Sequence, residues 1–418
     1  MLFVAKFGGT SISCAEQFAK VKNIVLSDPS RRVVVVSALG KRQPTDNKLT
    51  DLFYSIFENR SQSSYYNELW QEVIARFVAV KLELQLEFDV EGELKKIQDG
   101  LAARKLTLDY LVSRGEYLTA KLMSEYLGYD FYDAKDLIIF GEDGEVDSDL
   151  TYSRIASLIP RNRKVIIPGF YGADSFGDVK LFSRGGSDIT GALIAAGLKA
   201  DKYENFTDVP GVLMADPRIV LNPAPIPEIT YDEMSAIAYM GAEVLHKKSV
   251  HPVKFAGIPI HIKNTNDPLA PGTLITCSPT KIKNLIGIFG KKDYTVLTIK
   301  TRQPQADEFR DFFASYNIKV EYAQADDICI EVVISTVDIK YRFEHIINKL
   351  KLSFEIESIS SGDKMAIITI FTRENMFEDM PILGSYFAVL EQNDEMLMIL
   401  TADDFYEDVI RGLYRELV

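Results

Sequence analysis

KFGGTS, at Lys6–Ser11, follows a short apolar stretch at the start of the chain, and SRGGSD repeats the arrangement at Ser183–Asp188. In both places a predicted β-strand ends in a glycine pair, and a helical pattern with a hydroxyl residue as candidate cap begins just beyond. Glycine lets the backbone approach a ligand closely, because it has no Cβ atom. The helix that follows directs unpaired N–H groups and its positive dipole end at the same point. Two such junctions, with Lys6 beside the first, predict a cradle for a polyphosphate.

The pattern around these junctions predicts an α/β domain over residues 1–280. Leu2–Phe7, Arg32–Ser37 and Lys164–Gly169 are short apolar runs bounded by polar residues or glycine, as expected of buried parallel strands. Helical spacing dominates between Leu49 and Leu127. The expected architecture is an αβα sandwich around a mostly parallel sheet.

The C-terminal third has a different pattern. Strand, helix, strand, strand, helix and strand can be read in residues 284–360, and a shortened version follows in residues 361–418. This weak internal repeat predicts a tandem of ferredoxin-like α+β modules. The first strand of the first module is also available to pair with the second module.

Composition excludes several classes of protein. The 418 residues carry a net charge of −13 with no block of lysine or arginine, which argues against nucleic acid and anionic membranes as partners. Cys14, Cys277 and Cys329 are scattered, so we expect reduced thiols in a cytoplasmic protein rather than a disulfide framework or a zinc site. The start of the chain lacks the pattern of a signal peptide. No P-loop or G-x-G-x-x-G motif occurs, which disfavours P-loop kinases and dinucleotide dehydrogenases.

Further motifs accompany the two glycine junctions. They are VVVVSALG at 33–40, PTDNKLTDL at 44–52, SRGE at 113–116, FTDVPGVLMADPR at 206–218 and GAEVLH at 241–246. In order and spacing this set resembles the aspartokinases of the amino-acid-kinase superfamily over roughly the first two-thirds of the chain. The resemblance implies the amino-acid-kinase fold, and it implies that the C-terminal modules are a pair of ACT domains.

The resemblance implies transfer of the ATP γ-phosphoryl group to the β-carboxylate of L-aspartate. The product would be 4-phospho-L-aspartate, in the first step toward lysine, threonine and methionine. A carboxylate with a pKa of about 4 is ionised at neutral pH, so this nucleophile needs no general base. Catalysis then consists of bringing two anions together and stabilising charge on the phosphoryl oxygens. ATP and Mg²⁺ are the implied cofactors, and we expect Mg²⁺ to be held by ATP phosphates and water, without protein ligands.

The catalytic residues implied by the family motifs are Lys6 and Asp188. Lys6 suits the role as a compact cation beside a glycine turn, although it could also be a solvated lysine at a strand end. Asp188 would orient the lysine and nearby backbone amides toward the phosphoryl group. A plain helix N-cap is the competing interpretation of Asp188.

Binding residues are also carried over from the motifs. The implied ATP-binding residues are Lys6, Phe7, Gly8, Gly9, Ser187, Thr207, Asp208, Leu213, Asp216 and Arg218. The implied substrate-binding residues are Ser37, Thr45, Glu116 and Arg184. Arg184 would grip the α-carboxylate in bidentate fashion, Glu116 would take the α-ammonium, and the two hydroxyls would donate to the reacting carboxylate. The competing interpretation of Glu116 is a first-turn helix acid that the dipole favours.

Two departures from the family pattern keep alternatives open. The family often has an aromatic residue at Leu213, and many members have lysine at Glu243, so ATP affinity could differ from the usual. The alternatives are another carboxylate-phosphorylating member, such as an acetylglutamate or glutamate kinase, and an ACT-type amino-acid sensor with a weakened kinase domain. Pairing of ACT sheets would give a homodimer or a dimer of dimers. Lysine or threonine is the implied effector, but Thr301–Asp307 lacks the glycine of usual effector loops, which predicts weak or absent inhibition.

Overall fold

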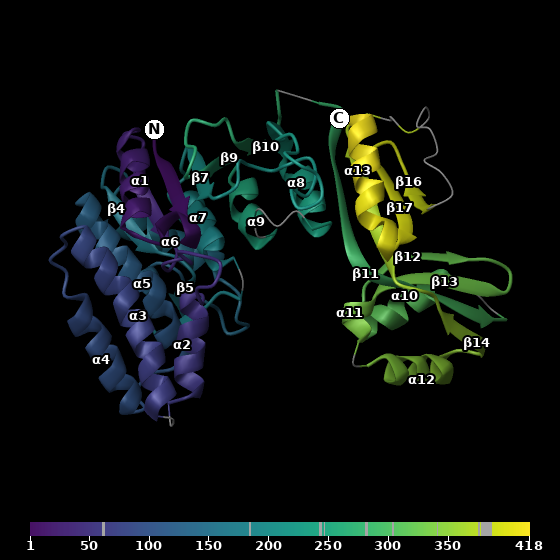
Figure 1. Ribbon diagram of the computed structural model, residues 1–418, viewed down its shortest axis with the longest axis horizontal. Coiled ribbons are helices and arrows are strands. Elements are labelled where there is room, and N and C mark those ends of the chain that lie inside the picture. The colour runs from purple at the N-terminus through teal and green to yellow at the C-terminus, as the bar shows by residue number, and fades with distance from the viewer. Residues whose placement is uncertain are drawn as a thin grey trace. The chain divides into compact units, whose positions relative to one another are not determined.

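Strands and helices are interspersed along the first two-thirds of the chain in the computed structural model (Figure 1). The structure describes residues 1–60, 63–183, 185–241, 245, 247–280, 283–302, 305–340, 342–374, 377 and 387–418. Two compact units are present. The first contains Met1–Val212, Pro225–Ala238 and Glu243–Lys281, and the second contains Leu213–Ala224, Tyr239–Ala242 and Ile282–Val418.

An eight-stranded sheet forms the centre of the first unit, in the order β3-β4-β2-β1-β7-β9-β10-β8. Its strands are β1 (Phe3–Phe7), β2 (Arg31–Val36), β3 (Asp130–Phe131), β4 (Val165–Pro168), β7 (Lys202–Thr207), β8 (Glu228–Thr230), β9 (Ile260–Asn264) and β10 (Thr273–Thr276). Neighbouring strands are parallel except β9 and β10, which confirms the predicted α/β fold. A separate hairpin pairs β5 (Tyr171–Ala173) with β6 (Val179–Leu181).

Strand β1 lies at the point where the order of the sheet reverses. The chain adds β2 and β4 on one side of β1 and later adds β7 on the other side. Ligands in open α/β sheets bind beyond the carboxyl ends of the strands at such a reversal. This topology directs attention to the ends of β1, β2 and β7.

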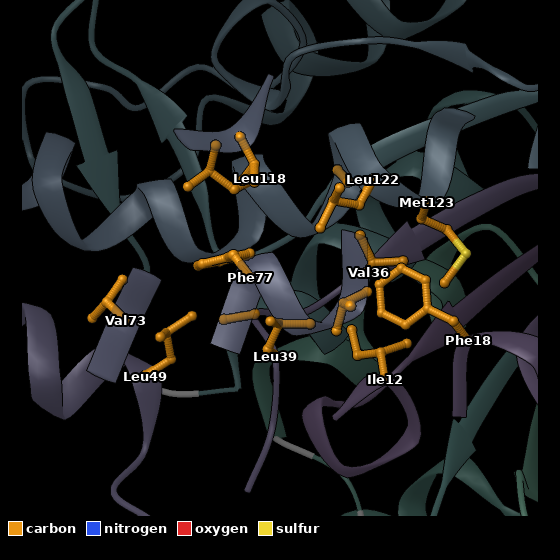
Figure 2. Close-up of a cluster of buried hydrophobic side chains, with 14 of the residues drawn as sticks. Ile12, Phe18, Val36, Leu39, Leu49, Val73, Phe77, Leu118, Leu122 and Met123 are labelled. Atoms are coloured by element: carbon orange, nitrogen blue, oxygen red, sulfur yellow. The ribbon is translucent and has the colours of Figure 1, made fainter. Parts of the chain in front are cut away.

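Helices cover the sheet of the first unit. They are α1 (Ala15–Leu26), α2 (Leu49–Glu58), α3 (Ser63–Glu83), α4 (Val90–Ala102), α5 (Leu108–Leu127), α6 (Ser148–Leu158), α7 (Gly186–Gly197), α8 (Tyr231–Tyr239) and α9 (Lys247–Phe255), with 3₁₀ turns at Gly9–Ile12 (η1) and Ala134–Asp136 (η2). Helices α1 to α5 share one apolar core with Ala5 and Phe7 of β1. Figure 2 shows Phe18 of α1, Val36 of β2 and Leu122 of α5 among its side chains. Because side chains alternate along a strand, Lys6 points to the opposite face of the sheet.

The second unit is built around an antiparallel sheet. Its elements are β11 (Leu285–Thr301), α10 (Ala306–Ser315), β12 (Val320–Ala325), β13 (Cys329–Ser335), α11 (Thr336–Ile339), α12 (Phe343–Ser353), β14 (Ile356–Ser361), β15 (Met365–Thr372), β16 (Phe387–Gln392), β17 (Met396–Ala402), η4 (Asp403–Phe405) and α13 (Tyr406–Leu417). The long strand β11 pairs with β15 along its first half and with β13 and β14 along its second half. From β11 to β14 the elements include the predicted strand, helix, strand, strand, helix and strand, with the short helix α11 in addition.

Three further properties concern the part of the chain that the structure describes. None of its helices is long and apolar enough to cross a lipid bilayer. Within the same residues, no group of three or more histidine, cysteine, aspartate or glutamate side chains is placed to hold a metal ion. Cys14, Cys277 and Cys329 are free thiols.

Candidate active site

The first glycine junction packs against a second loop. Gly40, in the loop after β2, donates its backbone N–H to the Gly9 carbonyl over 3.0 Å. A Cβ atom added to Gly40 would lie only 2.2 Å from the Gly9 carbonyl carbon, so the two loops meet backbone to backbone. The sequence predicted a helix with a hydroxyl N-cap directly after this junction. That prediction is wrong, because the 3₁₀ turn η1 lies between the junction and helix α1. Helix α1 begins later, at Ala15, and the side chain of its N-cap Cys14 makes no capping bond.

The second glycine junction starts helix α7. Gly185 is the N-cap and has a φ of 63°, in the left-handed region that favours glycine. A Cβ on Gly186 would lie 2.6 Å from the Phe170 ring, so this glycine is required by packing as well. Asp188 lies within the first turn and is not the N-cap, which rules out that interpretation of it. The neighbouring Arg184, predicted to bind substrate, lies outside the described residues.

The two junctions meet through their charged residues. The Lys6 ammonium lies 2.6 Å from Asp188 Oδ1 and donates to Asn205 Oδ1 over 3.3 Å. Asn205 in turn donates through Nδ2 to Asp188 Oδ1 over 2.9 Å. The side chain of Lys6 is 9% exposed, which excludes the interpretation of a solvated lysine. Sequence reasoning predicted Lys6 and Asp188 as partners but missed Asn205, whose only signal was an amide in a buried strand.

Glu116 lies in the middle of helix α5, whose N-cap is Thr107, so it is not a first-turn acid. Its carboxylate accepts a hydrogen bond from the backbone N–H of Ala38, just beyond β2. Its Oε2 atom is buried without a hydrogen-bond partner among the described residues. Burial raises the pKa of Glu116 to about 8, more than the Ala38 N–H and nearby Arg114 lower it. A buried, unpartnered carboxylate oxygen is suited to accept from a cationic ligand.

The carboxyl ends of β1 and β2 lie side by side. Ser37 donates its backbone N–H to the Phe7 carbonyl over 3.2 Å. Ala38, which contacts Glu116, therefore lies close to the first glycine junction. Thr45 is exposed in the loop between β2 and α2. The substrate roles of the Ser37 and Thr45 hydroxyls stay predictions.

A buried arginine fixes the loop between β2 and α2. Arg76, on α3, is 2% exposed and donates to the carbonyls of Asn47 over 2.8 Å and Leu39 over 3.2 Å, and also to that of Gly40. Burial lowers its pKa, although Asp46 raises it. Because Gly40 contacts Gly9, Arg76 holds both the Thr45 loop and the glycine turn. Nothing in the sequence pattern singled it out.

Arg76→Met is expected to destabilise the protein by about 2–4 kcal/mol, because it leaves several buried carbonyls without donors. The KM values for both substrates should also rise, since the loop that carries Thr45 loses its anchor. Urea unfolding and steady-state kinetics measure the two effects. Arg76→Lys serves as the matched variant, because it keeps the charge but cannot reach three carbonyls. Its stability and its KM values should lie between those of the parent and of Arg76→Met. Parental stability in Arg76→Met would contradict the anchoring role.

The predicted nucleotide residues fall into two groups. Ser187 is buried against Gly169, where an added Cβ would lie 2.6 Å from the serine hydroxyl. Thr207 ends β7, and its hydroxyl donates to Asp208 over 3.2 Å.

Leu213, Asp216 and Arg218 belong to the second unit. There the Arg218 guanidinium pairs with Asp216 at 2.6 Å. Phe7 is fully buried and stacks on Phe206, so only its backbone could face a nucleotide. All these ATP contacts stay predictions, and Glu243 lies outside the described residues.

Comparison with known proteins gives consistent relatives. The model of the amino acid kinase family matches residues 1–264. Aspartokinase 3 of Bacillus subtilis is 40% identical over 288 residues, which cover 65% of this chain and 63% of that protein. The chloroplastic aspartokinase 1 of Arabidopsis thaliana is 30% identical over 385 residues, covering 83% and 67%. The crystal structure of the aspartate kinase of Clostridium acetobutylicum, an allosteric enzyme, matches with a TM-score of 0.90 at 33% identity, covering 100% of both chains.

Proposed function

The chain belongs to the aspartokinases of the amino acid kinase family, and on that premise we propose that it transfers the ATP γ-phosphoryl group to the β-carboxylate of L-aspartate. The observation that carries the proposal is the Lys6 ammonium, held 2.6 Å from Asp188 between two glycine junctions at the reversal point of the sheet. The match to the Bacillus relative spans less than two-thirds of that protein's length. The activity is therefore argued from this site.

Lys6 would stabilise the charge that develops on the transferring phosphoryl group. An ammonium has three N–H donors, and the described contacts direct Lys6 toward Asp188 and Asn205. The remaining N–H is available to a phosphoryl oxygen. Gly8 adjoins the ammonium, since a Cβ there would lie 3.6 Å from Nζ, so backbone and cation can face the same phosphate. When bound, ATP would bring Mg²⁺ on its phosphates, to neutralise part of their charge.

The acceptor would lie beyond the ends of β1 and β2. Glu116 would accept the α-ammonium at its unpartnered Oε2, and Ser37, Thr45 and Arg184 would bind the carboxylates. Fixing both ends of L-aspartate orients its β-carboxylate toward the phosphoryl group, and such orientation is a major source of rate enhancement. The proposed binding of the substrate ammonium by the buried Glu116 carboxylate argues against an N-acetylated acceptor, because such an acceptor has no ammonium group.

The second unit would carry assembly and regulation. We infer a pair of ACT domains that joins copies of the chain into a homodimer or a dimer of dimers, with domain boundaries near residues 280 and 360. The long shared strand β11 supports treating the two modules as one piece. Lysine or threonine is the proposed effector class, with weak or absent inhibition because the sequence Thr301–Asp307 lacks glycine. A cytoplasmic location is proposed, which the three free thiols support.

Trapping the product tests the reaction itself. Purified protein with Mg-ATP, L-aspartate and hydroxylamine should form aspartyl β-hydroxamate and an equal amount of ADP. Omitting L-aspartate should stop both products. ADP formation without hydroxamate would show ATP hydrolysis alone and would overturn the proposed transfer to a carboxylate.

A further inference from the structure

Asn205 is a buried amide on β7, beside Lys6 and Asp188. Strand β7 runs parallel to β1 with Asn205 directly in register with Lys6, so both side chains point to the same face of the sheet. Asn205 is 2% exposed. Its carbonyl oxygen accepts from Lys6, and its NH₂ group donates to Asp188. Only this orientation of the amide satisfies both neighbours.

The residues that flank Asn205 on β7 have other partners. Tyr203, on the same face of β7, packs against α7 and donates its hydroxyl to the Asp188 carbonyl over 3.1 Å. On the other face, Phe206 joins the apolar core and Glu204 pairs with Arg31. A leucine would fill the volume of Asn205 without burying a polar group. Burying an amide is unfavourable unless it is hydrogen-bonded, so its value lies in the two bonds it makes.

We infer that Asn205 is a positioning residue for phosphoryl transfer, which holds Lys6 and Asp188 in the geometry that leaves one ammonium N–H for the phosphoryl group. This inference rests on the proposed function. A direct Lys6–Asp188 pair alone could rotate about the Lys6 side chain, because a single contact does not fix an ammonium. The amide adds a second acceptor for Lys6 and a donor for Asp188, so each member of the cluster has two partners.

The neutrality of Asn205 also matters. A second carboxylate at this position would sit beside Asp188 and offset the positive charge that must attract phosphate. An aliphatic residue would leave the charge of the cluster unchanged, but it would no longer hold Lys6 and Asp188 in place. The amide alone orients the pair without adding charge, so replacement by either type is expected to reduce catalysis, for different reasons.

Substitution at Asn205 tests the inference through kcat. Asn205→Leu should lower kcat tenfold or more, while the KM values for ATP and L-aspartate stay within about threefold, because the residue acts on the geometry of transfer. Asn205→Asp should also lower kcat and should raise the KM for ATP through repulsion. Asn59→Leu, at the C-cap of α2, removes an asparagine–backbone bond outside the cluster and serves as the control.

An exchange of the two groups separates positioning from mere packing. The double variant Asn205→Asp with Asp188→Asn keeps one carboxylate and one amide but swaps their places. It should recover at least tenfold in kcat over Asp188→Asn alone, and no recovery would contradict the inference. The exchange preserves side-chain size, so it stays decisive even if Asn205→Leu fails to fold. The kcat ratios between variants are measured with whichever carboxylate acceptor the wild type uses. If L-aspartate is not the substrate, the wild type alone shows it, and the kcat ratios still test the role of Asn205.

Discussion

Lys6→Ala is expected to lower kcat by about two orders of magnitude or more, because one preorganised charge at a developing oxyanion is worth about 3–4 kcal/mol. The substitution also leaves Asp188 with no ammonium partner, and its carboxylate then faces the phosphate site. The KM for ATP should therefore rise together with the loss in kcat. Steady-state kinetics with Mg-ATP and L-aspartate measure both constants, and circular dichroism with a thermal melt follows the fold.

Lys95→Ala is the matched control for this prediction. Lys95 is a largely exposed lysine on α4 that pairs with Asp99 one helical turn away, so its removal should leave both constants unchanged. Asp188→Asn should lose most activity as well, because Lys6 then loses its charged partner. A kcat for Lys6→Ala within a few-fold of wild type would remove the transition-state role of Lys6. Full activity in Asp188→Asn would reduce Asp188 to a structural residue.

Glu116→Gln is expected to raise the KM for L-aspartate by about 10²-fold or more, since an ionic partner of the substrate ammonium in a buried site is replaced by a neutral amide. Burial raises the pKa of Glu116 to about 8, so its carboxyl is mostly protonated at pH 7 without ligand. The substrate ammonium would ionise it. Binding of L-aspartate near pH 7 should therefore release close to one proton from the wild type and none from Glu116→Gln.

Isothermal titration in two buffers with different ionisation enthalpies measures this proton. The binding heat of the wild type should depend on the buffer, and that of the variant should not. Glu116→Asp is the matched control: it keeps the charge but shortens the reach toward the ammonium. Buffer-independent heats in the wild type would contradict the ammonium role of Glu116.

The same group predicts a pH dependence of stability. Folding raises the pKa of Glu116 from 4.5 to about 8, so the folded protein binds this proton more tightly. Its contribution to the free energy of unfolding is full below about pH 4.5, declines as pH rises through 8 and levels off above. The shift corresponds to roughly 3–5 kcal/mol. Urea unfolding from about pH 5 to about pH 9 should show a smaller decline in Glu116→Gln than in the parent.

Local sequence patterns predicted the buried strands and the positions of the glycine junctions. The apolar runs before KFGGTS and at residues 33–36 are buried parallel strands, as their apolar composition indicated. The second glycine pair does begin a helix, α7, whereas the first is followed by the 3₁₀ turn η1. Their role in the structure includes packing, because Gly9 lies against the backbone of Gly40 and Gly186 lies against Phe170. Sequence reasoning assigned glycine to ligand approach and could not see contacts between loops.

The remaining features of the site depend on tertiary contacts. Asn205 and Lys6 are 199 positions apart and meet only because β7 is inserted beside β1. Arg76 reaches the loop after β2 from a different helix. The burial of Glu116, and hence its raised pKa, follows from the packing of α5 against the end of β2. No spacing rule within one segment could give these relations.

The acceptor preference tests the central claim most directly. ATP-dependent hydroxamate formation is measured side by side with L-aspartate, L-glutamate and N-acetyl-L-glutamate at equal concentrations. We predict a strong preference for L-aspartate, because Glu116 and the carboxylate partners fix an ammonium and two carboxylates at set distances. Equal turnover of L-glutamate, or activity only with N-acetyl-L-glutamate, would contradict the account.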